Sequence, residues 1–424
     1  MTKTVVIGAG LAGQAAAREA SSTGAEVALI ERSPSLPLRK DAWRQLISGE
    51  VKLNHLEKEA ELMLGRLASA ITRFSESVEG IDFSKRRLTT SRGAVPFDTL
   101  VIASGSAALK ESFQGSSKRN VHEMGTPDSF AQLAARVTEF STVAVSGTNP
   151  LAIGVADALV KLGRRVTLFA PGGAMTSTLN ESIRSLLEDR IRGNGVTMVD
   201  GRVEGVAGVG KVEAILSGGS VVPCEALVLF PRSSPNPVNA RLTRGRAGGI
   251  LVDSEMKTSQ LGVYAAGDCA EVRIGATSLP MMYSSSAELM GEVAGINSAG
   301  GVAHARLSGV GLHRLFGLDV CHAGVTLREA RSSGADVLEA VATLEGDGAM
   351  RCSILFGRRD RAVLGVQIAG SRAAQFAGEA SMAVSGRVRL EDLTYHDVPY
   401  LPAASSDKSP LATAARVGVT MVSK

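Results

Sequence analysis

The sequence TVVIGAGLAGQAAAREASSTGAEVALIER, residues 4–32, decides the fold class of the first part of the chain. The apolar run from Val5 to Ile7 predicts a short buried strand, and the alanine-rich stretch that follows the glycines predicts a helix. Between them, Gly8, Gly10 and Gly13 complete a GxGxxG turn. The first glycine permits the tight turn, the second lets a pyrophosphate approach, and the third lets the helix pack closely on the strand.

A second apolar strand, Val27 to Ile30, ends in Glu31, where a carboxylate can accept hydrogen bonds from ribose hydroxyls. A strand–GxGxxG–helix–strand–Glu unit is far more specific than the glycines alone, and it predicts a Rossmann-like dinucleotide site. The residues of this segment expected to contact the dinucleotide are Gly8, Gly10, Leu11, Ala12, Gly13, Glu31 and Arg32.

Two distant segments carry a family resemblance. FDTLVIASGS (97–106) is an apolar strand that ends in Ser104-Gly105, and GGILVDSEMKTSQLGVYAAGDCAEV (248–272) ends in Gly267-Asp268. With the first unit, they make nearly the whole chain resemble the FAD-dependent pyridine nucleotide–disulfide oxidoreductase superfamily. The resemblance implies that FAD is bound, with Asp268 on the ribityl chain and Ala103, Ser104 and Gly105 near the flavin. Asp268 is alternatively the N-cap of the next helix, expected within 278–301, and Cys269 is expected to be a small core residue.

The stretch VAVSGTNPLAIGVADALVKLGRRVTLF, residues 143–169, has the outline of a second dinucleotide unit with altered glycines. Asn149 stands at the second glycine position, where it is expected to tolerate positive φ but to crowd a pyrophosphate. Pro150 suits the first turn of a helix, and Ala152 is an accepted third-position variant. The NAD(H) contacts expected here are Gly147, Asn149, Pro150, Leu151 and Ala152.

Two further positions weaken this second motif. Where the resemblance implies a glutamate near the nicotinamide, the sequence has Gly154, and no acid ends the second strand. No arginine follows that strand either, so nothing favours NADP over NAD. A working NAD(H) site and a relic or loosened site both stay open.

The cysteines exclude the usual chemistry of the family. Cys224, Cys269, Cys321 and Cys352 lie far apart, without a CxxC pair, a metal-ligand spacing or iron–sulfur ligands, as expected for buried thiols in a reducing cytosol. Residues 1–223 contain no cysteine, so the redox thiolate of the family's disulfide reductases and peroxidases is missing. In its place, Arg39, Lys40, Asp41, Trp43 and Arg44 are either a solvated loop capped by Asp41 or a docking surface for an acidic electron-transfer partner.

The composition narrows the class of partner. Hydrophobic residues make up 44% and charged residues 21% of the chain, as in globular proteins with a core. A net charge of +4 without basic runs, and 4% aromatic residues, argue against nucleic acid. Glycines interrupt the N-terminal apolar run and no segment is long enough to span a membrane, so we expect a cytoplasmic protein.

The C-terminal part alternates like antiparallel strands and then turns helical. VLGVQIAGSRAAQFAGEASMAV (363–384) and EDLTYHDVPYLPAASSDKSPLATAARV (391–417) resemble the C-terminal domain of coenzyme A-disulfide reductases and related NADH oxidases. That resemblance implies a homodimer formed through this domain, with Tyr395 or Tyr400 assisting thiol chemistry. Without the cysteine, a structural role for these tyrosines is favoured. His396 is either a proton donor or a hydrogen-bonded surface residue.

The resulting prediction is an α/β protein with two Rossmann-like domains and a C-terminal α+β domain. The FAD domain comprises 1–115 and 246–320, the NAD(H) domain 116–245, and the interface domain 321–424. The predicted function is an FAD-containing oxidoreductase that exchanges hydride with NAD(H) and electrons with an iron–sulfur partner. The flavin subunit of a tungsten aldehyde oxidoreductase complex has this kind of resemblance. Alternatives are a stand-alone NADH oxidase, an NADH:quinone or ferredoxin reductase, and a flavin-binding scaffold with a decayed NAD site.

Overall fold

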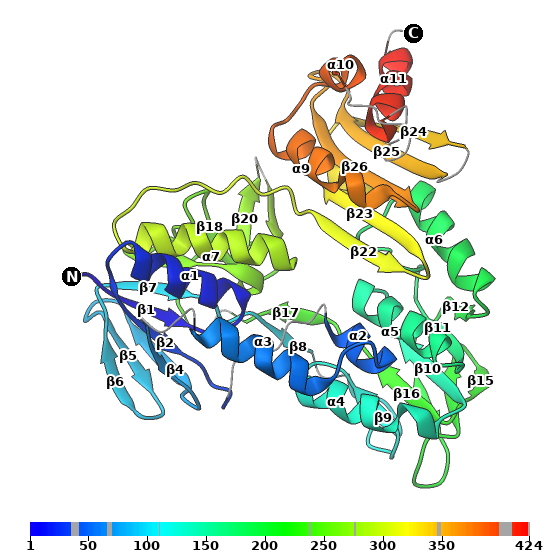
Figure 1. The fold of residues 1–424 in the computed structure, drawn as a ribbon, viewed down its shortest axis with the longest axis horizontal. Helices are drawn as coiled ribbons and strands as arrows, with labels where there is room; N and C mark the ends of the chain where they lie inside the picture. The colour runs from blue at the N-terminus through cyan, green and yellow to red at the C-terminus, as the bar shows by residue number, and fades with distance from the viewer. Residues whose placement is uncertain are drawn as a thin grey trace. The chain divides into compact units, whose positions relative to one another are not determined.

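The computed structural model describes residues 1–34, 42–65, 70–109, 111–236, 238, 240–274, 277–345, 349–397 and 409–422 (Figure 1). The chain forms two compact units. The first comprises residues 1–43, 51–110 and 232–307, and the second comprises residues 44–50, 111–231 and 308–424. Each unit is built around a five-stranded parallel sheet, which confirms the predicted α/β class.

The parallel sheet of the first unit has the strand order β19-β7-β1-β2-β3. Its strands are β1 (Lys3–Ile7), β2 (Glu26–Ile30), β3 (Ala70–Arg73), β7 (Thr99–Ile102) and β19 (Val263–Ala265). The helices of this unit are α1 (Leu11–Ser22), α3 (Leu53–Gly65) and α7 (Ser284–Ser298). The central strands are apolar and buried on both faces, as parallel strands covered by helices are.

Smaller sheets complete the first unit. They are formed by β4 (Val78–Asp82), β5 (Arg87–Thr90) and β6 (Gly93–Pro96); by β8 (Ser106–Ala108) and β17 (Ser233–Pro235); and by β18 (Ile250–Val252), β20 (Ala270–Ile274) and β21 (Thr277–Pro280). A 3₁₀ helix, Gly267–Cys269, connects β19 to β20.

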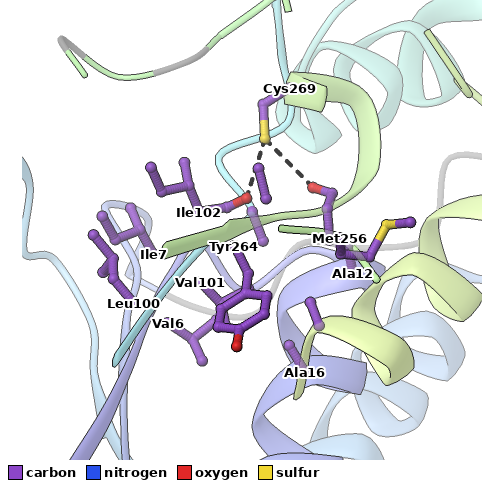
Figure 2. Close-up of a cluster of buried hydrophobic side chains, with 14 of the residues drawn as sticks. Val6, Ile7, Ala12, Ala16, Leu100, Val101, Ile102, Met256, Tyr264 and Cys269 are labelled. Carbon is purple, nitrogen blue, oxygen red and sulfur yellow. Dashed lines mark hydrogen bonds between the residues drawn. The ribbon is translucent and has the colours of Figure 1, made fainter. Parts of the chain in front are cut away.

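The core of the first unit gathers side chains from segments far apart in the sequence. Figure 2 shows Val6 and Ile7 from β1 beside Leu100 and Ile102 from β7, with Tyr264 from β19 in the same cluster. Helices α1 and α7 lie side by side, and a Cβ on Gly291 or Gly295 of α7 would collide with the backbone of α1. The alanine-rich sequence of α1 therefore serves close helix packing as well as helix formation.

The parallel sheet of the second unit has the order β12-β11-β10-β16-β9. Its elements are β9 (Val121–Glu123), α4 (Pro127–Arg136), a 3₁₀ helix (Val137–Glu139), β10 (Thr142–Ser146), α5 (Pro150–Lys161), β11 (Arg165–Phe169), α6 (Glu181–Gly193), β12 (Thr197–Val199) and β16 (Ala226–Leu229). An antiparallel sheet of β13 (Gly205–Ala207), β14 (Ala214–Ser217) and β15 (Ser220–Pro223) accompanies it. The short helix α2 (Trp43–Ser48) belongs mainly to this unit.

The C-terminal part of the second unit is an antiparallel sheet of order β22-β23-β26-β25-β24, as the alternating pattern predicts. Its elements are β22 (Gly311–Leu315), β23 (Leu318–Gly324), α8 (Leu327–Ser332), β24 (Val337–Leu344), β25 (Met350–Gly357), β26 (Val363–Gly370), a 3₁₀ helix (Ala373–Phe376), α9 (Ala377–Ser385), α10 (Leu390–Thr394) and α11 (Pro410–Val422). The predicted three-domain limits stay a prediction. Within the described ranges, no helix combines the length and apolarity that a membrane span requires.

Candidate nucleotide-binding sites

The GxGxxG turn of the first unit is shaped by backbone contacts that only glycine permits. Gly8 has φ +95°, and a Cβ there would collide with the carbonyl of Ala103 on the neighbouring strand. A Cβ on Gly13 would collide with the carbonyl of Gly8. Nothing lies within 4 Å of a Cβ built on Gly10, so the second glycine faces open space. These positions agree with the roles predicted for the three glycines.

The first turn of α1 leaves its amides available. Gly10 is the N-cap of α1 and forms no side-chain cap hydrogen bond. The first amides of a helix have no partner inside it, so Leu11, Ala12 and Gly13 present their N–H groups at the helix N-terminus. Together with the helix dipole, such amides form an anion site suited to a pyrophosphate.

Glu31 is held rigidly at the end of β2. The residue is 6% exposed, its Oε2 accepts a hydrogen bond from Ala9 N at 2.7 Å, and its Oε1 accepts one from Ser33 N at 2.8 Å. Two main-chain amides therefore fix the carboxylate beside the glycine turn, and each oxygen keeps a lone pair for a further donor. Arg32 follows it as an exposed side chain.

The two distant segments meet the glycine turn. Ala103 N donates to Ile7 O at 2.8 Å, and a Cβ on Gly267 would lie 2.9 Å from the Cβ of Ala12. Ser106 Oγ donates to Asp268 Oδ2 at 3.0 Å. The structure thus brings Ala103–Gly105 and Gly267–Asp268 to the glycine turn and α1, and their contacts with FAD stay a prediction.

The predicted alternative for Asp268 is wrong. Asp268 lies inside the 3₁₀ turn Gly267–Cys269, and strand β20 follows it. The N-cap of α7 is Tyr283. Cys269 is fully buried, as expected of a core residue, and its sulfur lies 3.3 Å from Ile102 O (Figure 2).

A cavity of about 440 Å³ opens beside these elements. It is lined by Ile7, Gly8, Ile30, Glu31, Arg32, Glu76, Ser77, Val78, Ser104, Asn236, Val238 and Arg244. Sequence reasoning missed Glu76, Ser77 and Val78 and the lining residues beyond position 200 because no motif marks them. Arg244 lines the cavity, and its guanidinium donates to Gly248 O and Ala240 O, both at 3.4 Å. The size, the glycine turn and the buried carboxylate fit the adenosine diphosphate part of a dinucleotide.

The second motif repeats a backbone hydrogen bond of the first. Gly147 N donates to Phe169 O at 3.1 Å, as Gly8 N donates to Ile30 O at 2.8 Å. Gly147 has φ +155°, and a Cβ there would lie 2.8 Å from the Cβ of Ala152. The turn glycine is therefore required here too, and the turn accommodates alanine at the third position.

Asn149 differs from its predicted conformation. It has φ −83° and ψ 162°, which is extended backbone, so its tolerance of positive φ is not used. It is instead the N-cap of α5, and its Oδ1 accepts a hydrogen bond from Ala152 N at 2.9 Å. Pro150 occupies the first helical position, as predicted, and has no N–H. Leu151 is thus the residue of this first turn whose amide is left for a ligand.

The end of β11 has no acid, as the sequence indicates, but two carboxylates approach from elsewhere. Asp200, after β12, accepts from Gly172 N at 2.7 Å, and Glu188 of α6 accepts from Ala174 N at 3.0 Å. Buried Met175 donates its N–H to Thr148 O at 2.8 Å. These bonds hold the loop after β11 against the glycine turn.

Part of the predicted docking patch is turned inward. Trp43 is 3% exposed. The guanidinium of Arg44 contacts both carboxylate oxygens of Glu50 at 3.3 Å and lies 4.0 Å from buried Asp157. A Cβ on Gly154 would lie 3.5 Å from Arg44 Cδ, so this side chain covers the position where the resemblance implies a glutamate. Arg39, Lys40 and Asp41 lie outside the described residues.

The cysteines are unsuited to thiol chemistry. All four are free and buried. Burial raises the pKa of Cys224 to about 11 and that of Cys321 to about 12. It also raises the pKa values of Cys269 and Cys352. A buried thiol that stays protonated is a poor nucleophile.

Of the C-terminal candidate residues, Tyr395 and His396 lie within the described part of the chain. Tyr395 is 76% exposed, and Tyr400 lies outside the described residues. His396 Nδ1 forms a hydrogen bond with Leu393 O at 2.8 Å, and its Nε2 lies 3.4 Å from Glu379 Oε1. Burial raises the pKa of Glu379. These contacts agree with the hydrogen-bonded interpretation of His396.

The sequence profile of the pyridine nucleotide-disulphide oxidoreductase family matches residues 2–288. The chain belongs to this family, and the predictions of its fold class and of an oxidoreductase are confirmed. An NADH oxidase of Streptococcus pyogenes is 24% identical over 446 residues, covering 95% of this chain and 96% of that protein.

Solved structures agree on the fold. An NAD-dependent persulfide reductase from A. fulgidus has a TM-score of 0.90 at 24% identity, over 99% of this chain and 83% of that chain. Putidaredoxin reductase, in its covalent complex with putidaredoxin, has a TM-score of 0.79 at 18% identity, over 90% of this chain and 93% of that chain. Structural neighbours of this fold thus include a reductase seen with its redox partner.

Proposed function

We propose that this chain is an FAD-containing oxidoreductase that exchanges hydride with NAD(H) and passes electrons to or from a second redox partner without a thiol. The observation that carries the proposal is the cavity of about 440 Å³ beside the glycine turn, with Glu31 fixed in its wall. The resemblance of the Gly267-Asp268 turn supports FAD over NAD at this site. The names of the related NADH oxidase and NAD-dependent reductase support NAD(H) as the second nucleotide.

The residues of the first unit have separable tasks in this proposal. The amides of Leu11, Ala12 and Gly13 bind the pyrophosphate, and Glu31 accepts from the ribose hydroxyls. Asp268, oriented by the hydroxyl of Ser106, accepts from the ribityl hydroxyls. FAD supplies the chemistry when bound, since a flavin takes two electrons as hydride and releases them singly. The protein binds, orients and excludes water.

The absence of thiol chemistry rests on the cysteines. The chain has none before Cys224, and all four are buried with raised pKa values. Electrons must therefore leave the flavin directly. An iron–sulfur partner fits this requirement because this sequence offers no cluster ligands of its own. The finer identification as the flavin subunit of a tungsten aldehyde oxidoreductase stays a prediction.

The C-terminal part carries several exposed apolar side chains. Met382 is 69% exposed and Tyr395 is 76% exposed, and Val417 and Met421 of α11 are also exposed. Singly exposed apolar side chains are common on protein surfaces, so the interface is proposed from the family resemblance of residues 363–384 and 391–417. A homodimer through this part, or another subunit covering it, is included in the proposal.

The choice of electron acceptor tests the proposed function. NADH consumption by the FAD-loaded chain is measured with oxygen, with a soluble quinone, and with a small iron–sulfur protein such as putidaredoxin. We expect slow turnover with oxygen and quinone and faster turnover with the one-electron protein acceptor. Rapid turnover with oxygen alone would favour the stand-alone oxidase, and no NADH consumption with any acceptor would favour the scaffold.

A further inference from the structure

The N-termini of α1 and α5 offer different hydrogen-bond donors to a pyrophosphate. In α1 the N-cap is Gly10, and the amides of the first turn point outward without a side-chain acceptor. In α5 the first helical residue is Pro150, which has no N–H, and the amide of Ala152 is bonded to Asn149 Oδ1 at 2.9 Å. In the first turn of α5, the amide of Leu151 is therefore the donor left for a pyrophosphate.

We infer that Asn149 competes internally with the nicotinamide dinucleotide, because its side-chain oxygen occupies the amide that a pyrophosphate oxygen would use. The inference rests on the proposed function, which places NAD(H) at this motif. Tight binding then requires the asparagine side chain to leave the Ala152 amide. Asn149 thereby sets the affinity of the second site.

Backbone hydrogen bonds on both sides of the glycine turn before Asn149 limit any movement of the turn that would free the Ala152 amide. Thr148 O accepts from the N–H of buried Met175 at 2.8 Å, which fixes the turn on its outer side. Gly147 N donates to Phe169 O at 3.1 Å, which fixes it on the strand side. The side chain of Asn149 is only half-buried, so its rotation is less hindered than a shift of the backbone.

The backbone at Asn149 accepts substitutions that change the capping oxygen without straining the chain. Because Asn149 has φ −83°, alanine fits this backbone without strain. Asn149→Ala removes the capping oxygen and keeps the Cβ, whereas Asn149→Gly removes both. Asn149→Asp keeps the cap and adds a negative charge facing the pyrophosphate. Thr126→Ala is the matched control, because Thr126 caps α4 of the same unit by accepting from Ser129 N at 3.3 Å.

The experiment measures the NADH dissociation constant of each FAD-loaded variant by anaerobic calorimetry, with the flavin first reduced by dithionite, and the exchange of the Ala152 amide by mass spectrometry. We expect Asn149→Ala to bind NADH about tenfold more tightly and Asn149→Asp about tenfold more weakly than the natural protein. The Ala152 amide should exchange faster in Asn149→Ala, and NADH should restore its protection. Thr126→Ala should leave the NADH affinity unchanged.

The failure of this inference differs from the failure of the proposed function. If Asn149→Ala binds NADH no more tightly than the natural protein while NADH still reduces the flavin in both, the inference is overturned and the proposed function stands. If neither protein binds NADH although both retain FAD, the inference and the nicotinamide part of the proposed function fall together. An unchanged Ala152 exchange rate in Asn149→Ala also overturns the inference.

Discussion

The two glycine turns of this chain share one backbone hydrogen bond and differ in the donors that they offer to a ligand. In both, a glycine amide bonds to the last residue of the second strand, at 2.8 Å for Gly8 and 3.1 Å for Gly147. In the first turn the helix N-terminus is left open by Gly10, and in the second it is closed by Asn149. A sequence outline can therefore preserve a Rossmann turn while Asn149 and Pro150 together reduce the amides that it offers to an anion.

The largest expected difference between the two turns is the loss of stability on substitution at the third position of the motif. Gly13→Ala places a Cβ against the carbonyl of Gly8 and should destabilise the protein by about 3 kcal/mol. The reverse change in the second motif, Ala152→Gly, should cost about 1–2 kcal/mol through helix propensity and the loss of one buried methyl group. Thermal unfolding and FAD content measure both. Equal losses would contradict the distinction between the two turns.

The next difference is in how strongly nucleotide affinity depends on a carboxylate in each unit. Glu31→Gln keeps one acceptor oxygen but loses the charge that orders Ala9 N and Ser33 N, so FAD affinity should fall by about 2 kcal/mol, roughly 30-fold. In the second unit, Asp200→Asn should change NADH affinity by about twofold or less, because Asp200 bonds to the loop amide of Gly172. Calorimetry measures each constant. A large effect of Asp200→Asn would make it a ribose ligand.

A third test concerns Arg244, a residue of the first site that no sequence motif predicts. Arg244 lines the cavity of the first unit, so Arg244→Gln should weaken FAD binding by about 1 kcal/mol, roughly fivefold. Arg246→Gln is the control, since Arg246 is exposed and does not line that cavity. The rate of FAD loss on dialysis measures the effect. Equal rates for both variants would remove Arg244 from the site.

The smallest expected effect concerns one cysteine from each half. Cys269 and Cys224 are buried, and the pKa of Cys224 is raised to about 11, so neither thiol ionises appreciably at pH 8. Flavin reduction by NADH should change by about twofold or less in Cys269→Ala and Cys224→Ala. Iodoacetamide at pH 8 should not inhibit the natural protein. Inhibition that Cys224→Ala or Cys269→Ala abolishes would restore a thiol mechanism.

The sequence predicted the parts of the structure that depend on local patterns. The strand, turn and helix around Gly8–Gly13 follow from apolar periodicity and glycine spacing. The burial of the four cysteines follows from their wide spacing without a CxxC pair. The meeting of the Gly267-Asp268 turn with α1 followed from family resemblance and not from local pattern.

The rest depends on tertiary contacts. Asn149 was expected at positive φ, but its own capping hydrogen bond favours extended backbone. Arg244 is held by hydrogen bonds to the carbonyls of Gly248 and Ala240, and no motif spacing in the sequence predicts these contacts. Arg44 was expected in a solvated or docking patch, and its partners Glu50 and Asp157 come from packing that the sequence does not encode locally.

The most direct test of the central claim is an anaerobic titration of the FAD-loaded protein with NADH, following the flavin absorbance in the natural chain and in Asn149→Ala. We predict that NADH bleaches the flavin in both, with half-reduction at a lower NADH concentration in Asn149→Ala. A flavin that dithionite bleaches and NADH leaves oxidised in both proteins would contradict the account.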